Sequence, residues 1–308
     1  MSRRRRKLAL FPTGEGLPQG DDPALPGPVS GSAQPALRWP QASAWVGSTW
    51  SPAHTAHCGM TDPGRRRALN EDAFLADGRL GLFIVADGVG GRPFGGLAAG
   101  EAVSVLWEWI YRETRALGAS MIGRGVTEGH EAALQIGDVV RSAMQNASRT
   151  LRTMARTEPR YAGMCTTASV VLVAGEIAVV GQVGDSRVYH ARGAEVRQVT
   201  EDHTLLNLRV KQGLSIPEHA RGRRSPITRA LGLTDELEVD IYAVPLARGD
   251  RLLLCSDGLH EYFDRATVLR HLFRLDIRAA ARAAVRHARR RGGRDNITAL
   301  FVEILGPG

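Results

Sequence analysis

The sequence predicts an α+β protein with antiparallel strands at its centre and helices outside them. Short β-rich runs joined by tight turns occupy 167–175, 176–184 and 187–192, which is the pattern of an antiparallel meander. Two long stretches, 98–117 and 130–156, carry apolar residues at helical spacing. Strands and helix pairs follow one another in blocks. This order leaves two architectures open: a two-layer α+β core, or a sandwich of sheets with helices outside.

The other elements follow from local patterns. A strand is expected over 80–87, where five apolar residues from Leu82 to Ala86 precede Asp87. The runs 238–246 and 251–258 continue the meander. Two helical patterns and a last strand complete the chain, at 266–274, 277–291 and 296–305.

Composition narrows the class of protein. No apolar run reaches the length of a membrane-spanning helix, and the apolar run after the first arginines is too short for a signal peptide. The three cysteines are widely spaced and form no CxxC pair, which favours a reduced, cytoplasmic protein over a disulfide frame or a structural zinc site. The net charge is +8. Because no basic motif with interleaved aromatic residues accompanies this charge, a solvated basic surface is expected and no nucleic-acid partner is.

The first part of the chain differs from the rest. Eight of the fifteen prolines lie within the first 52 residues, and no hydrophobic period is visible there. Such a composition buries too little apolar surface to offset the entropy of ordering. Residues 1–50 are therefore expected to form a mostly disordered, basic tail, and 51–308 the folded domain.

Acidic residues recur at the ends of the predicted strands, beside small residues. The set comprises Glu71, Asp72, Asp87, Asp185, Asp257 and Asp295. A single residue of this kind is usually a turn or helix cap, but that explanation weakens with each repetition. If the strand ends converge, the buried carboxylates repel one another, and Mg²⁺ or Mn²⁺ would relieve this repulsion because both prefer oxygen ligands. No histidine stands among them, which speaks against zinc.

Eight segments resemble, in order, the signatures of the metal-dependent protein phosphatases, or type 2C serine/threonine phosphatases, in their bacterial branch. They are TDPGRRRALNEDAF, VADGVGG, GMCTTASVVLV, VGDSRVY, TEDHTLL, SPITRALG, LLLCSDGL and GGRDNITAL, and they span 57–305. The resemblance implies a four-layer fold, in which a central antiparallel β-sandwich is flanked by helix pairs. It also implies hydrolysis of phosphoserine and phosphothreonine on phosphoprotein substrates, in opposition to a bacterial serine/threonine kinase.

The resemblance also implies a centre of two Mn²⁺ or Mg²⁺ ions. In this family pattern Asp87 bridges both metals. Glu71 and the backbone carbonyl of Gly88 match ligands of one metal, whereas Asp257 and Asp295 match ligands of the other. The glycine after Asp87 lets the backbone approach closely enough to offer its carbonyl.

Three further residues match family positions. Asp72 matches a carboxylate that holds metal-bound water, and Asp185 resembles the ligand of a third, weakly bound metal shared with Asp257. Arg67 stands where the family keeps its phosphate-binding arginine, whose guanidinium fork suits a phosphoryl group. The alternative role for Arg67 is to pair with Glu71 or Asp72 and offset their repulsion.

Some positions depart from the family. Animal members place a histidine where this chain has Val89, so a metal-bound water is expected to protonate the leaving oxygen, with His203 as a weaker candidate. Cys165 replaces a glycine and is expected to be packed in the interior. Residues 204–227 occupy the place of the family's flap, and their arginines (Arg221, Arg223 and Arg224) either attract an acidic phosphopeptide or belong to a solvated loop.

Three functional hypotheses result. The first is an active phosphatase, and the second is a pseudophosphatase or phosphoprotein-binding regulatory module that keeps only the fold. The third, a basic nucleic-acid-binding protein, rests on charge alone and ranks last. Nothing in the sequence indicates an oligomer, so a monomer is expected.

Overall fold

The computed structural model describes residues 54–89, 94–121, 130–216, 224–263 and 266–306. The predicted tail over 1–50 therefore lies outside the described residues, as do Arg221 and Arg223. Among the helices that are described, none is both long and apolar enough to cross a membrane.

Two antiparallel sheets of five strands each form the centre of the molecule. One sheet has the order β1 (His54–Asp62), β10 (Ile297–Gly306), β9 (Arg251–Cys255), β6 (Arg187–Arg192) and β7 (Glu195–Gln198). The other has the order β2 (Asp72–Asp77), β3 (Leu82–Asp87), β4 (Ala168–Ala174), β5 (Ile177–Val183) and β8 (Asp240–Pro245).

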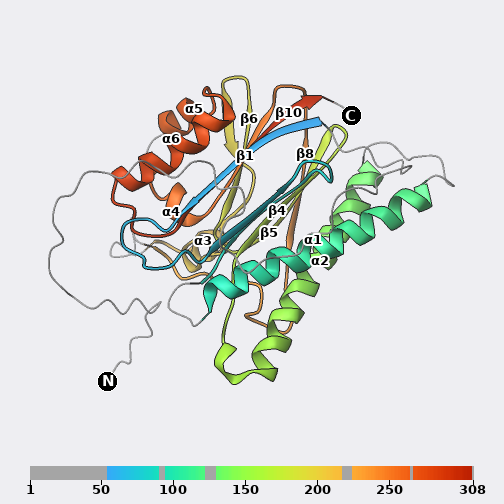
Figure 1. Cartoon of the computed structure of the whole chain (residues 1–308), viewed down its shortest axis with the longest axis vertical. Helices are drawn as coiled ribbons and strands as arrows, with labels where there is room; N and C mark the ends of the chain where they lie inside the picture. Colours follow the sequence, from blue (N-terminus) through green and yellow to red (C-terminus); the bar gives the residue numbers. More distant parts are fainter. Residues whose placement is uncertain (1–53, 90–93, 122–129, 217–223, 264–265, 307–308) are drawn as a thin grey trace.

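Helix pairs cover the outer faces of the sheets (Figure 1). The helices α1 (Gly95–Met121) and α2 (His130–Thr157) pack on the sheet that contains β3, and α5 (Ala266–Leu272) and α6 (Ile277–Arg290) lie over the other sheet. Shorter helical segments are α3 (Leu205–Lys211), α4 (Asp257–His260) and a 3₁₀ turn over Pro159–Tyr161. Of the two predicted architectures, the structure has the sandwich of two sheets with helices outside. The prediction of a four-layer α+β fold is therefore confirmed.

Three apolar clusters fill the three spaces between the four layers. Phe83, Val171 and Leu300 belong to the cluster between the sheets, and Ile84 belongs to the cluster under α1 and α2. β3 is therefore covered on both faces, which explains why its sequence is continuously apolar and not alternating. This double cover makes β3 a rigid support for Asp87 at its end.

The expected meander is wrong at its third strand. β4 and β5 form a hairpin, but β6 pairs with β9 and β7 in the opposite sheet. The crossing occurs at Gly184, whose φ of +101° suits glycine. The Gln182 side chain stabilises the crossing, because its Nε2 donates to the carbonyls of Gly184 and Ser186 at 3.1 and 2.8 Å.

Other boundaries also differ from the prediction. The sequence patterns did not indicate β1, β2, β7, α3 or α4. The predicted strand 251–258 ends at Cys255, and Asp257 opens α4. The helix expected over 98–117 runs from Gly95 to Met121.

Candidate metal centre

The predicted acidic residues lie at one end of the sandwich, where both sheets contribute. Asp72 begins β2 and Asp87 ends β3, and the two stand opposite each other in the antiparallel register. Asp257 follows β9 and Asp295 precedes β10, two adjacent strands of the other sheet. The charges of these residues and of Asp185 all act on Asp87, so the fold does bring them together.

The backbone of Asp87 is fixed on both sides by two threonines. Its N–H donates to Thr167 Oγ1 at 3.0 Å, and its carbonyl accepts from Thr166 Oγ1 and from the Thr167 N–H, both at 2.9 Å. Burial raises the pKa of Asp87 well above its ordinary value, and the neighbouring carboxylates raise it further. The arrangement holds a carboxylate rigidly in a place where its negative charge is costly.

Asp72 has one oxygen with partners and one without. Its Oδ2 accepts from Ser256 Oγ at 2.7 Å and from Thr298 Oγ1 at 2.6 Å. Its Oδ1 is buried, and among the described residues it has no hydrogen-bond partner. Burial raises the pKa of Asp72 to about 7. A buried oxygen of this kind calls for a donor, such as an ordered water, or for a nearby cation.

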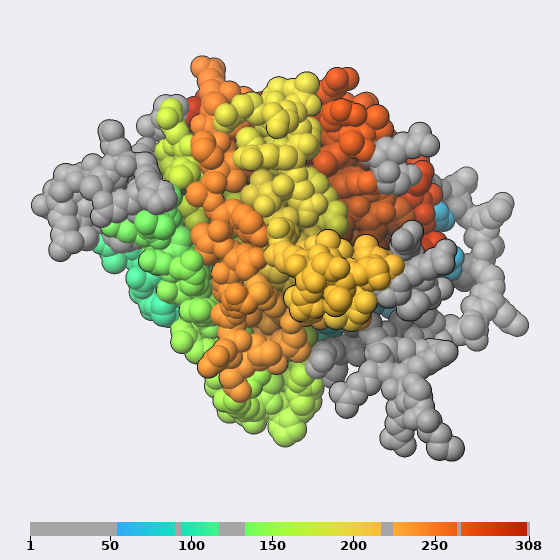
Figure 2. All heavy atoms as spheres, turned by 180° about the vertical axis from the view of Figure 1, so that it is seen from behind, coloured from blue at the N-terminus to red at the C-terminus, as the bar shows by residue number. Residues whose placement is uncertain are grey.

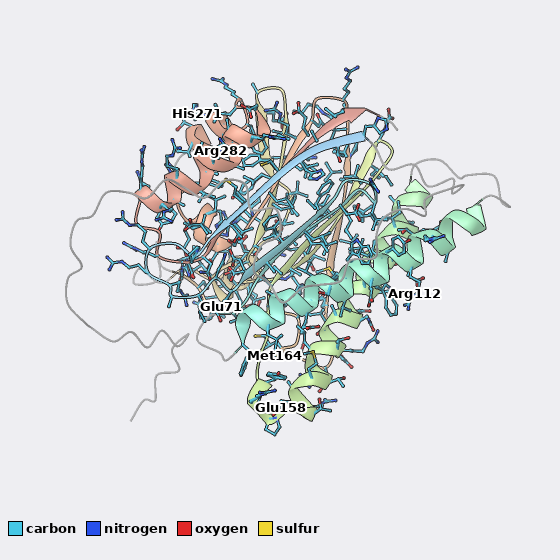
Figure 3. All side chains as sticks on the ribbon, in the orientation of Figure 1. Glu71, Arg112, Glu158, Met164, His271 and Arg282 are labelled. Atoms are coloured by element: carbon cyan, nitrogen blue, oxygen red, sulfur yellow. The ribbon has the colours of Figure 1, made fainter. Side chains whose placement is uncertain are left out.

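Glu71 and Gly88 meet at the start of α1, and Figure 3 labels Glu71 there. The Gly88 N–H donates to the Glu71 carbonyl at 3.1 Å, and the Glu71 carboxylate accepts from the N–H groups of Gly95 and Gly96. A Cβ at Gly88 would lie 2.4 Å from the carbonyl carbon and oxygen of Gly95. Only glycine lets these backbones approach so closely, which is the reason for a glycine directly after Asp87.

Asp295 is surrounded by arginines, unlike Asp87. Arg67 Nε lies 2.9 Å from Asp295 Oδ1, and Arg67 Nη2 donates to Asp295 Oδ2 at 3.0 Å. Arg224 donates to the same Oδ2 of Asp295. Arg224 also lies 3.3 Å from Asp257 Oδ2. Burial by itself would raise the pKa of Asp295, but Arg224 and then Arg67 outweigh it, so that the pKa is lowered.

The position of Arg67 bears on its two predicted roles. It forms its ion pair with Asp295 and not with Glu71 or Asp72, the partners expected from the sequence for a purely charge-balancing role. Its side chain is 31% exposed, and the ion pair engages Nε and Nη2. Arg67 is therefore at the site, accessible from outside and adjacent to the expected metal ligands.

Two histidines support loops of the site. His260 follows the Asp257 motif on α4, and its Nε2 lies 2.8 Å from the Asp185 carbonyl; burial lowers the pKa of His260 to about 4, so this nitrogen donates from a neutral ring. His203 Nδ1 accepts the Gly184 N–H at 3.2 Å, and its Nε2 faces Asp240 at 3.1 Å. Both histidines join the Asp185 loop to neighbouring segments.

Several supporting residues were missed by the sequence analysis. They are small polar residues inside the same motifs, namely Thr166, Thr167, Ser256, Asn296 and Thr298. Asn296 Oδ1, for example, accepts the Glu71 N–H at 2.9 Å, and its Nδ2 donates to the carbonyls of Pro63 and Leu69. Their signal was position, since each lies within one of the family segments quoted above, beside or a few residues from a motif carboxylate or a second threonine. Cys165 is buried, as expected.

The donor set fits hard divalent cations. It consists of carboxylates and one backbone carbonyl, and the partnerless oxygen of Asp72 lies in the same environment. Within the residues that the structure describes, no three acidic, cysteine or histidine side chains are gathered closely enough to form a ready coordination shell. Arg224 and Arg67 engage Asp295 instead.

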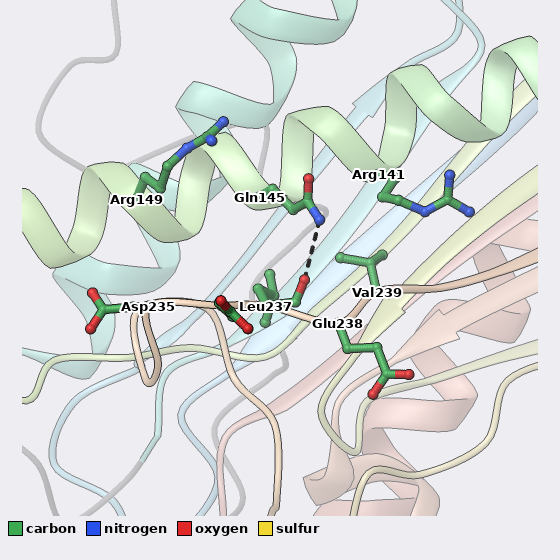
Figure 4. Close-up of a pocket in the computed structure, with 8 residues that line it drawn as sticks. Arg141, Gln145, Arg149, Asp235, Leu237, Glu238 and Val239 are labelled. Carbon is green, nitrogen blue, oxygen red and sulfur yellow. Dashed lines mark hydrogen bonds between the residues drawn. The ribbon is translucent and has the colours of Figure 1, made fainter.

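A hollow lies away from the acidic residues, between α2 and residues 235–239 (Figure 4). Arg141, Gln145 and Arg149 line it from the helix, and Gln145 Nε2 donates to the Leu237 carbonyl at 3.2 Å. Asp235, on its rim, is paired with Arg152 and Arg156. None of the predicted site residues lines this hollow.

Comparison with known proteins agrees with the fold. The sequence model of the family described as protein phosphatase 2C matches residues 64–289. The chain therefore belongs to this family. The serine/threonine phosphatase stp of Listeria innocua is 34% identical over 249 residues, which cover 79% of this chain and 93% of that protein. The serine/threonine protein phosphatase PstP of Mycobacterium tuberculosis is 32% identical over 81% of this chain, but the match spans only 45% of PstP.

Solved structures show the same fold. The catalytic domain of the serine/threonine protein phosphatase PstP, in complex with two manganese ions, is 29% identical and superposes with a TM-score of 0.65 over 82% of this chain and 98% of that one. The phosphatase Stp1 from Staphylococcus aureus is 26% identical, with a TM-score of 0.69 over 83% of this chain and 98% of that one. The predicted family, in its bacterial branch, is confirmed.

Proposed function

We propose that the chain is a metal-dependent protein serine/threonine phosphatase that hydrolyses phosphoserine and phosphothreonine esters, opposing a bacterial serine/threonine kinase. The observation that carries the proposal is the buried acidic end of the sandwich, where Asp72 Oδ1 has no partner among the described residues and Arg67 stands at the edge. Relatives that are named serine/threonine phosphatases match most of the chain.

Two divalent cations, Mn²⁺ or Mg²⁺, would be held by the strand-end carboxylates. Asp87 would serve both ions, with Glu71 and the Gly88 carbonyl on one side and Asp257 and Asp295 on the other. Asp185 would contribute to a third, weaker position together with Asp257. Such a pair of cations supplies an activated water at neutral pH and neutralises charge on the phosphoryl group.

The chain's own residues would orient the substrate and the water. Arg67, accessible at the rim, would bind phosphoryl oxygens through its guanidinium. Asp72, fixed by Ser256 and Thr298, would hold a water at Oδ1. Val89 offers no proton, and His203 is engaged with Gly184 and Asp240, so neither side chain is assigned as the acid for the leaving oxygen.

The competing possibility is a pseudophosphatase that only binds phosphoproteins. A binding module does not need Arg67, Asp87, Asp257 and Asp295 together, and all four are present. Turnover of p-nitrophenyl phosphate and of a phosphothreonine peptide distinguishes the two. Activity should disappear in EDTA and return with Mn²⁺ or Mg²⁺. Full activity after dialysis against EDTA would rule out the metal-dependent mechanism, and the absence of turnover with either ion would favour the binding module.

A further inference from the structure

Arg224 reaches three carboxylates from a segment that is distant in the sequence. Its guanidinium forms ion pairs with Asp295 and Glu261, and Nη1 lies 3.3 Å from Asp257 Oδ2. Only a third of the Arg224 side chain is exposed, at 33%, and those of Asp257 and Asp295 are 11% and 12% exposed. Arg224 is thus inserted among the acidic residues and is not a solvated loop residue.

The contacts of Asp295 leave little room for a further cation. Oδ2 accepts from both Arg67 Nη2 and Arg224 Nη1. Oδ1 accepts the Asn296 N–H at 3.0 Å and lies 2.9 Å from Arg67 Nε. A carboxylate oxygen offers about two lone-pair directions, so Oδ2 is fully engaged. Any ion that takes Oδ2 must displace one of the two arginines.

The backbone that carries Arg224 is fixed by residues on its C-terminal side. Ser225 Oγ accepts the Leu206 N–H at 2.9 Å, the Pro226 carbonyl accepts the Leu205 N–H at 2.8 Å, and the Thr228 N–H donates to the His203 carbonyl at 2.8 Å. These contacts join 225–228 to the start of α3, on the face shown in Figure 2. Because the backbone is fixed, the side chain of Arg224 is held within reach of the carboxylates.

We propose that Arg224 is an internal competitor of the divalent cation at the Asp257–Asp295 position. Its guanidinium takes the same carboxylate oxygens that the cation requires, so the ease with which Arg224 leaves them sets the affinity of this metal position. Before it is displaced, Arg224 offsets the repulsion between the two buried carboxylates. The proposal rests on the metal centre proposed above and assigns a role to a residue outside the set of metal ligands.

Calorimetric titration of Mn²⁺ into EDTA-treated, desalted protein tests this competition. Arg224→Gln should bind Mn²⁺ about tenfold more tightly than the wild type, because a ligand's apparent affinity is reduced by the fraction of protein whose site is blocked. The Mn²⁺ affinity of Arg224→Lys should lie between those of the wild type and Arg224→Gln, since an ammonium group keeps the charge but cannot engage two carboxylates as a planar fork does. Arg66→Gln is the matched control. It removes one exposed positive charge beside the site and should change the affinity by less than about twofold.

Thermal unfolding gives a second readout that does not depend on activity. Without Mn²⁺, Arg224→Gln should melt below the wild type, because Arg67 still pairs with Asp295 but Asp257 and Glu261 lose their contact with the Arg224 guanidinium. Saturating Mn²⁺ should shrink this deficit, since the ion then takes the place of the guanidinium. If Arg224→Gln does not fold, the same comparison is made with Arg224→Lys.

The outcomes separate the inference from the proposed function. Equal Mn²⁺ affinity in the wild type, Arg224→Gln and Arg66→Gln would overturn the competition and leave the metal centre standing. A melting deficit that saturating Mn²⁺ leaves unchanged would do the same. If neither the wild type nor any variant bound Mn²⁺, the metal centre and the competition would both fall.

Discussion

The two halves of the acidic site balance their charges in different ways. On the β2–β3 side, Asp72 and Asp87 face each other without an arginine in contact among the described residues, and burial raises the pKa of both carboxyls. On the β9–β10 side, Asp257 and Asp295 lie against Arg224, and arginines lower the pKa of Asp295. The two halves therefore differ in whether a positively charged side chain contacts the buried carboxylates.

This difference follows from where each half can be reached. Asp87 ends a strand that is covered on both faces, and Asp72 is held between two hydroxyl groups, which leaves both without an arginine contact from the described residues. Asp295 lies in the loop before β10, where Arg67 and Arg224 arrive from loops outside the sandwich. A buried carboxylate that is charged and has no partner destabilises the fold. In each half, the local geometry decides whether hydroxyl groups or arginines stabilise the carboxylates.

The largest expected effect comes from the half without arginines. Asp87→Asn keeps the shape of the side chain but removes the charge that is expected to serve both cations, and kcat should fall by at least about two orders of magnitude. Steady-state turnover of a phosphopeptide with Mn²⁺ measures it. Asp235→Asn makes the same chemical change at an exposed ion pair and should leave kcat unchanged. If Asp87→Asn stayed within a few-fold of the wild type, the central role of this half would be wrong.

Arg67→Ala tests the half that holds arginines. If Arg67 binds the phosphoryl group, Arg67→Ala should lower kcat/KM by an amount that corresponds to about 2–4 kcal/mol of lost transition-state stabilisation. Arg67→Lys should restore only part of this loss, because an ammonium lacks the bidentate fork. Mn²⁺ affinity, measured by calorimetry, should change less than in Arg224→Gln. The exposed neighbour supplies the control, Arg66→Ala. A large change in Mn²⁺ affinity with an unaltered KM would show that Arg67 serves the Asp295 charge and not the substrate.

The close backbone approach in the first half predicts an effect on stability. Gly88→Ala places a Cβ 2.8 Å from the Glu71 carbonyl oxygen, and closer still to Gly95, so the start of α1 must shift. Overpacking of this kind costs about 1–3 kcal/mol. Gly100→Ala, inside α1 with no atom within 4 Å of the added Cβ, should instead stabilise by about 0.5–1 kcal/mol. Thermal or urea unfolding of both variants compares them. Equal stabilities would mean that the approach at Gly88 is not tight.

The smallest expected effect concerns pH and lies outside both halves. Burial lowers the pKa of His203 below its ordinary value, and this outweighs the opposing influence of Asp240. The folded state therefore binds the proton less readily than the unfolded state does. The stability that His203 contributes is present above about pH 6.5 and declines as the pH falls through that value, by at most about 1.4 kcal/mol per unit.

Urea unfolding between pH 5 and 8 measures the slope, and His203→Gln should reduce it while leaving the part that His260 contributes. The same variant should keep the pH profile of kcat, because His203 supports the Gly184 loop and is not assigned as an acid. A lost alkaline limb in the kcat profile would instead make His203 the general acid.

Much of the candidate site could be predicted from the sequence because its signals are local. An apolar run that ends in Asp and Gly identifies Asp87 and Gly88, and the repeated pattern identifies Asp185, Asp257 and Asp295. Glu71 and Asp72 belong to the same set of acidic residues, whereas Arg67 and the use of the Gly88 carbonyl as a ligand came from the resemblance to a family. β1, β2 and β7 were missed because their mixed composition shows no clear period, and their pairing partners lie far along the chain.

The sequence by itself determined the long helices, the strongly apolar strands and the carboxylates that stand at strand ends, because hydrophobic period and turn chemistry act over a few residues. Only the tertiary structure decided that β6 joins the sheet of β9, that Asp72 keeps one oxygen without a hydrogen-bond partner in the described part of the chain, and that Arg224 meets Asp295 across 71 positions. Such pairings depend on how strands and loops that are distant in the sequence pack in space. A local pattern encodes the face that a residue presents, but not the partner that it meets.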